Sequence, residues 1–326
     1  MCGSSKVTEF REQLENPRLD PLPAAKELYQ ILIGPIAKDL EGAQAQTLMW
    51  SLDGVLRYIP IAALHDGRGY LVERYRNVEF TPASQARLKD VPGEQWRGLG
   101  LGVSKEHEGF SALKGVPDEL HGIIRDERDK TSRGVVAGTV ELDEDFTEES
   151  FRASLRNGYG LVHVASHFRF RPGNEMDSFL LLGDGQHLTL DRIRSLPNVF
   201  GGVRLLTLSA CDTAVGGVMA GGKEVDGFAV LAQRQGAKAV MATLWPVADQ
   251  STQIFMRRFY ELRESFPRLS KAESLQRAQM ELLATGRQAS LTDGGQEQVV
   301  GSKPGADRDY SHPYYWAPFI LIGNWR

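Results

Sequence analysis

The chain has 326 residues, of which 41% are hydrophobic, and its 42 acidic and 38 basic residues leave a formal net charge of -4. This balance gives no general attraction to phosphate backbones or anionic lipids, so we expect neither nucleic acid nor a membrane as a partner. The first residues lack the apolar stretch of a secretory signal, and no apolar run reaches the roughly 18 residues that span a bilayer. Cys2 and Cys211 are the two cysteines and form no disulfide framework, so we expect a cytoplasmic protein without a metal or cofactor.

Helical and strand patterns alternate along the chain. Residues 23–33 have the apolar spacing of an amphipathic helix that Gly34-Pro35 interrupts, and residues 50–64 indicate a hairpin whose turn is Asp53-Gly54. Short continuous apolar runs predict buried strands at 98–104, 134–140, 160–166, 178–183, 203–209, 237–244 and 318–323. Helical periodicity predicts helices at 117–128, 147–156, 224–235, 249–265 and 270–285. This alternation is typical of an α/β fold with a largely parallel sheet.

The last of these helices has clear signals at both ends. Ser270 and Glu273 form a capping pair at its start, and Gly286 predicts its end. The following stretch, residues 287–311, is rich in Gly, Ser, Asp and Gln and has little periodicity. We expect it to be a mobile loop before the closing strand.

Three of the predicted strands lead to side chains suited to catalysis. GLVHVASH ends on His167, GVRLLTLSACDT carries Cys211 just past its strand, and GAKAVMATLWPVAD ends on Asp249. Because ligands of parallel α/β sheets bind at the carboxyl edge of the strands, we expect these three side chains to share a cleft. A thiol attacks carbonyl carbon as the thiolate, and a nearby imidazole can remove its proton and later protonate a leaving amine. The sequence therefore predicts Cys211 as a nucleophile and His167 as its base.

Two neighbouring features have plainer interpretations. His163 points to the same face of its strand as His167 but one layer deeper, so we expect a structural histidine with satisfied hydrogen bonds. GVMAGGKE, residues 217–224, departs from the phosphate-binding pattern G-x-x-x-x-G-K-[ST] at its last position, where Glu224 replaces the hydroxyl that holds magnesium. We expect this segment to form a flexible wall beside Cys211.

The motifs resemble a known family. HVASH at 163–167, LSACDT at 208–213 and GAKAVMATLWPVAD at 236–249 are similar to motifs of the CHAT family of caspase-like cysteine peptidases, which are relatives of separase. The resemblance extends in order from about residue 25 to the final WAPFILIGNWR. It implies a caspase-like sandwich, with a largely parallel central sheet flanked by helices on both faces. Within it we expect an N-terminal helical lead at 1–40 and the CHAT domain at 41–326.

The resemblance also implies residue roles and an activity. The family's dyad maps onto His167 and Cys211 and implies peptide-bond hydrolysis through a thioester. Backbone N–H groups of Cys211 and of the residue after His167 would form the oxyanion hole; the family usually has Gly there, whereas this chain has Phe168. Asp249 matches an acidic position that binds a basic substrate side chain before the cut, although capping the following helix explains an aspartate there equally well.

Three classes of function follow from these patterns. The first is a cysteine endopeptidase acting on a protein or peptide substrate, with cleavage after Arg or Lys. The second is a catalytically silent interaction or regulatory module, which the Phe168 departure would permit, and nucleotide binding is a distant third. Because the chain has no array of helical repeats, we expect control by a regulatory partner or an upstream sensor region. Arg287, Lys303 and Arg308 in the expected loop are candidate sites of self-cleavage.

Overall fold

The computed structural model describes residues 2–89, 96–171, 176–209, 223–247, 249–292 and 309–326. Its centre is a nine-stranded sheet with the strand order β1-β2-β12-β11-β10-β6-β3-β5-β4. The bounds of these strands, in sheet order, are Thr47–Trp50, Arg76–Glu79, Phe319–Gly323, Ala239–Thr243, Leu205–Leu208, Leu161–Ala165, Gly98–Gly102, Val136–Leu142 and Ile124–Asp126. The six strands from β11 to β4 are parallel to one another, and β12 pairs antiparallel with β11. The expected α/β fold with a largely parallel sheet is therefore confirmed.

A second, three-stranded sheet follows β6 and is antiparallel. It contains β7 (Phe168–Arg169), β8 (Phe179–Leu181) and β9 (His187–Thr189), in that order. The prediction at 178–183 corresponds to β8, whereas β7 and β9 were not predicted, because strands of two or three residues carry no periodicity.

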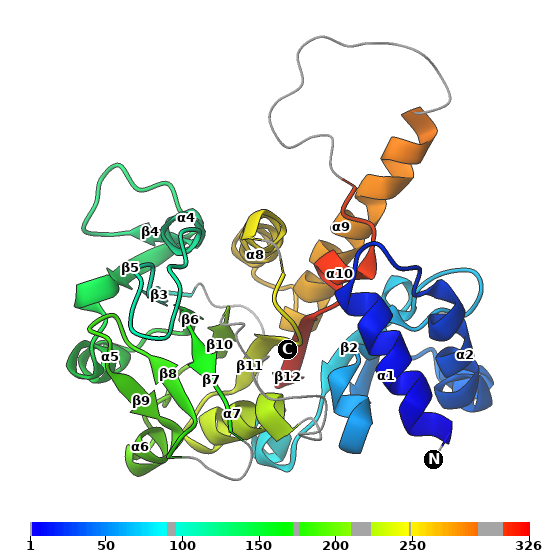
Figure 1. The fold of residues 1–326 in the computed structure, drawn as a ribbon, viewed down its shortest axis with the longest axis horizontal. Helices are drawn as coiled ribbons and strands as arrows, with labels where there is room; N and C mark the ends of the chain where they lie inside the picture. Colours follow the sequence, from blue (N-terminus) through cyan, green and yellow to red (C-terminus); the bar gives the residue numbers. More distant parts are fainter. Residues whose placement is uncertain (1, 90–95, 172–175, 210–222, 248, 293–308) are drawn as a thin grey trace.

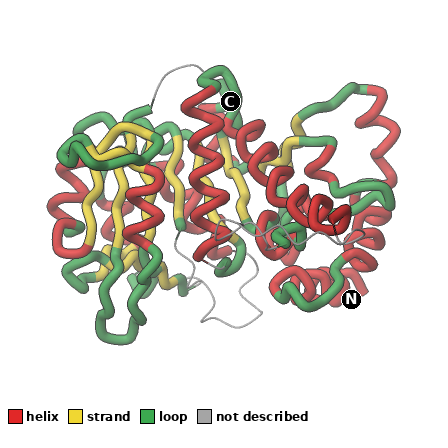
Figure 2. Tube along the Cα trace, turned by 90° about the horizontal axis from the view of Figure 1, so that it is seen from above, coloured by secondary structure: helices red, strands yellow, loops and turns green. Residues whose placement is uncertain are grey.

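Helices cover both faces of the central sheet (Figure 1). One face is covered by α4 (Val116–Ile123), α8 (Asp249–Ser265) and α9 (Lys271–Thr292), and the other by α7 (Lys223–Arg234). The remaining helices are α1 (Cys2–Glu15), α2 (Leu22–Leu32), α3 (Ala37–Gly42), α5 (Glu148–Leu155), α6 (Leu190–Ser195) and α10 (Pro313–Trp316). Figure 2 shows the strands side by side, with the N-terminal helices at one end of the molecule. Phe10 and Leu14 of α1 are fully buried against the rest of the chain, and a boundary at residue 40 stays a prediction.

Three elements differ from the sequence predictions. Residues 50–64 do not form a hairpin: β1 pairs with β2 instead, and the segment continues as 3-10 helices Gly54–Tyr58 and Ile61–Ala63, the first capped by the Asp53 carboxylate. The helix expected at 117–128 ends at Ile123, because the next residues pair with β5 as β4. The helix expected to stop at Gly286 continues to Thr292, so that glycine does not act as a terminator.

The glycines of β3 allow α4 to lie close to the sheet. A Cβ at Gly102 would come within 2.7 Å of the side chains of Leu120 and Val116, and one at Gly100 would lie 3.3 Å from Leu120 Cδ2. The alternation in GLGLG thus leaves one face of β3 bare for the helix, while Leu99 and Leu101 fill the core on the other.

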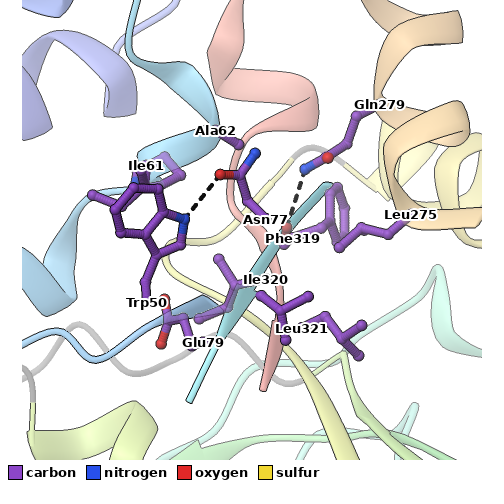
Figure 3. A pocket seen from close by; sticks show the side chains of 12 residues that line it. Trp50, Ile61, Ala62, Asn77, Glu79, Leu275, Gln279, Phe319, Ile320 and Leu321 are labelled. Carbon is purple, nitrogen blue, oxygen red and sulfur yellow. Dashed lines mark hydrogen bonds between the residues drawn. The ribbon is translucent and has the colours of Figure 1, made fainter. Parts of the chain in front are cut away.

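A small cavity lies where β1, β2 and β12 meet α9 (Figure 3). Its volume is about 20 Å³, which is room for about one water molecule. Trp50 Nε1 donates to Asn77 Oδ1 at 2.9 Å, and Gln279 Nε2 donates to the Phe319 carbonyl at 3.2 Å. These polar groups are paired within the fold, so this space belongs to the packing of the sheet.

No helix among the described residues has both the length and the apolar character needed to cross a bilayer.

Candidate active site

The carboxyl edge of β6 and β10 carries the candidate site. The two strands pair in parallel, with Leu208 opposite Val164, and Ser209 N still donates to the Val164 carbonyl at 2.8 Å. His167 lies two residues past β6 and is only 5% exposed. Cys211 lies outside the described residues, two positions along the chain from Ser209, which directly follows β10.

One hydrogen bond fixes the tautomer of His167. Its Nε2 lies 2.8 Å from the carbonyl oxygen of Ser111, in the loop between β3 and α4. A carbonyl oxygen can only accept, so Nε2 carries the proton, and the neutral ring has its lone pair at Nδ1. The Phe110 ring packs against the imidazole with a centroid separation of 5.1 Å. The ring of His167 is therefore oriented by the loop beside it, with Nδ1 as its basic atom.

Asp143, just past β5, anchors the start of that loop. Its carboxylate accepts hydrogen bonds from Ser104 N and Ser104 Oγ, both at 2.7 Å, and from Lys105 N at 3.2 Å. Burial alone would raise the pKa of Asp143, but these hydrogen bonds outweigh burial and lower the pKa below its ordinary value. Asp143 also has a positive φ of 51°, an uncommon backbone conformation for a residue other than glycine.

A cleft of about 380 Å³ opens at this edge of the sheet. Its volume falls within the range of small-ligand and side-chain pockets. Its described walls come from the loop before α4, from α4 itself, from the ends of β6, β10 and β11, and from the start of α8. They comprise Ser111, Leu113, Gly115, Val116, Glu119, Ser166, His167, Ser209, Thr243, Pro246, Val247, Thr252 and Gln253.

Phe168 turns its side chain away from this cleft. The ring is 4% exposed and packs against Phe228 of α7, with a centroid separation of 5.1 Å. Leu181 N donates to the His167 carbonyl at 2.9 Å, which makes these two residues a hydrogen-bonded pair. Along two antiparallel strands, hydrogen-bonded residue pairs alternate with pairs that share no hydrogen bond. Phe168 and Leu180 form the next pair, which shares none, so Phe168 directs its backbone N–H away from β8. The Phe168 ring, which a glycine at this position would lack, is thus packed in the core.

The other predicted features are described only in part. Asp249 begins α8, as expected for its helix, but its side chain is outside the described part of the structure. The phosphate-loop-like segment at 217–224 lies outside the described residues up to position 222, and most of the expected loop at 287–311 does so too. The positions of Asp249 and Cys211 in the site therefore stay predictions.

A buried hydrogen-bond chain lies beneath the cleft. His163 is fully buried; its Nε2 donates to Glu119 Oε1 at 2.9 Å, and its Nδ1 lies 3.0 Å from the Tyr260 hydroxyl. Tyr260 is in turn 2.7 Å from Thr207 Oγ1, and burial raises its pKa far above the ordinary value, so the hydroxyl keeps its proton. The prediction that His163 is a satisfied structural histidine is confirmed. Two residues of the site carry no signal in the sequence: Glu119, whose partner is 44 positions away, and Ser111, which acts through a backbone group.

The chain belongs to the CHAT-domain family, whose model matches residues 22–324. This confirms the resemblance that the HVASH and LSACDT motifs indicate. A curated relative, mouse tetratricopeptide repeat protein 28, is 32% identical over 122 residues; the match covers 37% of this chain and 4% of that protein.

Solved structures similar to this chain share little sequence identity with it. Among them is the separase–securin complex of Saccharomyces cerevisiae, with 13% identity, a TM-score of 0.45 and coverage of 82% of this chain and 14% of that one. Another is the Arg-specific cysteine proteinase gingipain R, with 10% identity, a TM-score of 0.47 and coverage of 93% of this chain and 67% of that one.

Proposed function

We propose that this protein is a cysteine endopeptidase with His167 as its base and Cys211 as its nucleophile. The observation that carries the proposal is the hydrogen bond from His167 Nε2 to the Ser111 carbonyl, on the wall of a cleft at the sheet edge. It leaves Nδ1 as the basic atom and gives the imidazolium an acceptor when the ring becomes protonated. Family membership supports the same pair of residues.

The reaction would proceed in two halves. His167 Nδ1 takes the proton of the Cys211 thiol, and the sulfur attacks the scissile carbonyl carbon, forming a C–S bond. Backbone N–H groups of Cys211 and Phe168 stabilise the oxyanion; then the C–N bond breaks as the imidazolium protonates the leaving amine. Water, deprotonated by the same imidazole, attacks the thioester, and the C–S bond breaks to return the thiol and release the acid.

Asp249 would set a preference for a basic residue before the cut. It lies at the start of α8, and neighbouring residues of that helix, Thr252 and Gln253, line the cleft. A carboxylate there would pair with an arginine or lysine side chain of a protein substrate. The expected control by a partner or an upstream region is part of the proposal; the repeat protein among the relatives, of which the match covers 4%, is consistent with such a region.

A fluorogenic peptide library varied at the residue before the cut tests this function. Wild type is expected to cleave after Arg or Lys under reducing conditions, Cys211→Ala to abolish cleavage, and Asp249→Ala to remove the basic preference. An irreversible thiol-directed peptide probe, applied to wild type and His167→Ala, separates a latent enzyme from a binding module. The peptidase proposal fails if wild type neither cleaves any peptide nor reacts with the probe at Cys211.

A further inference from the structure

Glu119 is the one carboxylate among the described residues that line the cleft. It belongs to the first turn of α4 and is 8% exposed, and no lysine or arginine lines the described part of the cleft. A carboxylate that is largely withdrawn from water, with no lysine or arginine on the described walls around it, favours a ligand that brings a positive charge.

The buried chain beneath the cleft holds this carboxylate in one orientation. A carboxylate only accepts, so His163 Nε2–H donates to Oε1, and in the neutral ring His163 Nδ1 then accepts the proton of the Tyr260 hydroxyl. The Tyr260 oxygen accepts from Thr207 Oγ1, so each proton in the chain is used once. Among the described residues only His163 binds the Glu119 carboxylate, through Oε1, so Oε2 is available to whatever enters the cleft.

The sheet itself places the carboxylate there. Gly100 of β3 is directly beside His163 of β6, and the bare glycine face of β3 lets α4 approach the sheet. Glu119 therefore contacts His163 of β6, the strand that leads to His167.

We propose that Glu119 is a specificity-determining residue, which binds the guanidinium or ammonium group of the substrate's basic side chain through Oε2. The Asp249 carboxylate proposed above, at the start of α8, would be a second acidic partner for the same basic side chain. This inference rests on the proposed function for its meaning in catalysis, but binding of a cationic side chain can be measured without turnover.

The experiment uses two fluorescein-labelled peptides that differ only in arginine or citrulline, its uncharged isostere. Binding is measured by anisotropy with the Cys211→Ala chain, alone and combined with Glu119→Gln. The amide of glutamine can still accept from His163 but carries no charge. Asp118→Asn is the matched control, because it removes a carboxylate from the same turn of α4 at an exposed position that does not line the cleft.

The Cys211→Ala chain is expected to prefer the arginine peptide, and Glu119→Gln to reduce that preference about tenfold to hundredfold, as expected for a hydrogen bond between charged groups. Asp118→Asn should leave the preference unchanged. Glu119→Asp, which keeps the charge on a shorter side chain, should lower it less than Glu119→Gln, and it replaces that variant if the latter does not fold.

Equal binding of the two peptides by the Cys211→Ala chain, no binding of either, or a preference that survives Glu119→Gln would overturn the inference. Failure of the proposed function looks different. In that case wild type cleaves neither peptide, while the arginine preference in binding still depends on Glu119.

Discussion

Replacing Asp143 by Asn should loosen the loop that orients His167 and destabilise the fold in a pH-dependent way. The Asp143 carboxylate accepts three hydrogen bonds from Ser104 and Lys105. Asn tolerates the positive φ of 51° at this position, so the change removes charge and one acceptor without adding backbone strain. Because hydrogen bonds to charged groups contribute about 1.5–3 kcal/mol each and the amide oxygen keeps part of them, we expect a loss of about 1–3 kcal/mol at neutral pH.

The sign of the pH dependence follows from the lowered pKa of Asp143. Its stabilisation is complete above the pKa of the carboxyl in the unfolded chain, about 3.9, and is lost as the pH falls through the lower folded-state pKa. The difference between wild type and Asp143→Asn should therefore be constant near pH 7 and shrink below about pH 4. Urea unfolding at a series of pH values measures it, with Asp145→Asn, an exposed acid in the same turn, as the control. A difference that stays constant or grows in acid would refute this account of the Asp143 carboxylate.

Two further changes probe the packing around the cleft. Tyr260→Phe should lower the free energy of unfolding by about 1–3 kcal/mol, because it leaves His163 Nδ1 and Thr207 Oγ1 without a partner. Urea unfolding measures this loss. The control is Tyr310→Phe, which should be nearly neutral because the buried Tyr310 hydroxyl has no partner among the described residues. Gly102→Val should cost about 1–3 kcal/mol or more by overpacking against Leu120, whose Cδ1 would lie 2.6 Å from the new Cβ. The control is Gly122→Ala in α4, where a Cβ would have nothing within 4 Å, so this change should be neutral or stabilising. Equal shifts in melting temperature for Gly102→Val and Gly122→Ala would contradict close packing of α4 against β3.

Much of the α/β architecture was predictable because it depends on local pattern. Strands β3, β6, β10 and β12 coincide with continuous apolar runs, and all five residues of β6 are buried, as a strand covered on both faces requires. The helix predicted at 249–265 has the bounds of α8, because its apolar residues recur at helical spacing and are buried on one side of the helix, as Phe255, Phe259 and Leu262 show. Where the pattern was short, as in β4 and β7, pairing with the next strand along the chain decided the structure.

The candidate site likewise has features that local sequence predicts and features that depend on tertiary contacts. The sequence by itself determined that His167 follows a buried strand and therefore lies at the carboxyl edge of the sheet, since this depends only on the apolar run before it. Which nitrogen of His167 is basic was decided by the tertiary structure, because the acceptor is a backbone carbonyl 56 positions away and a backbone group has no residue signature. The fold likewise brought Glu119 to the wall of the cleft. The glycine face of β3 lets α4 approach the sheet, and His163, itself bonded to the Tyr260 hydroxyl of α8, binds the carboxylate; only tertiary packing places those groups together.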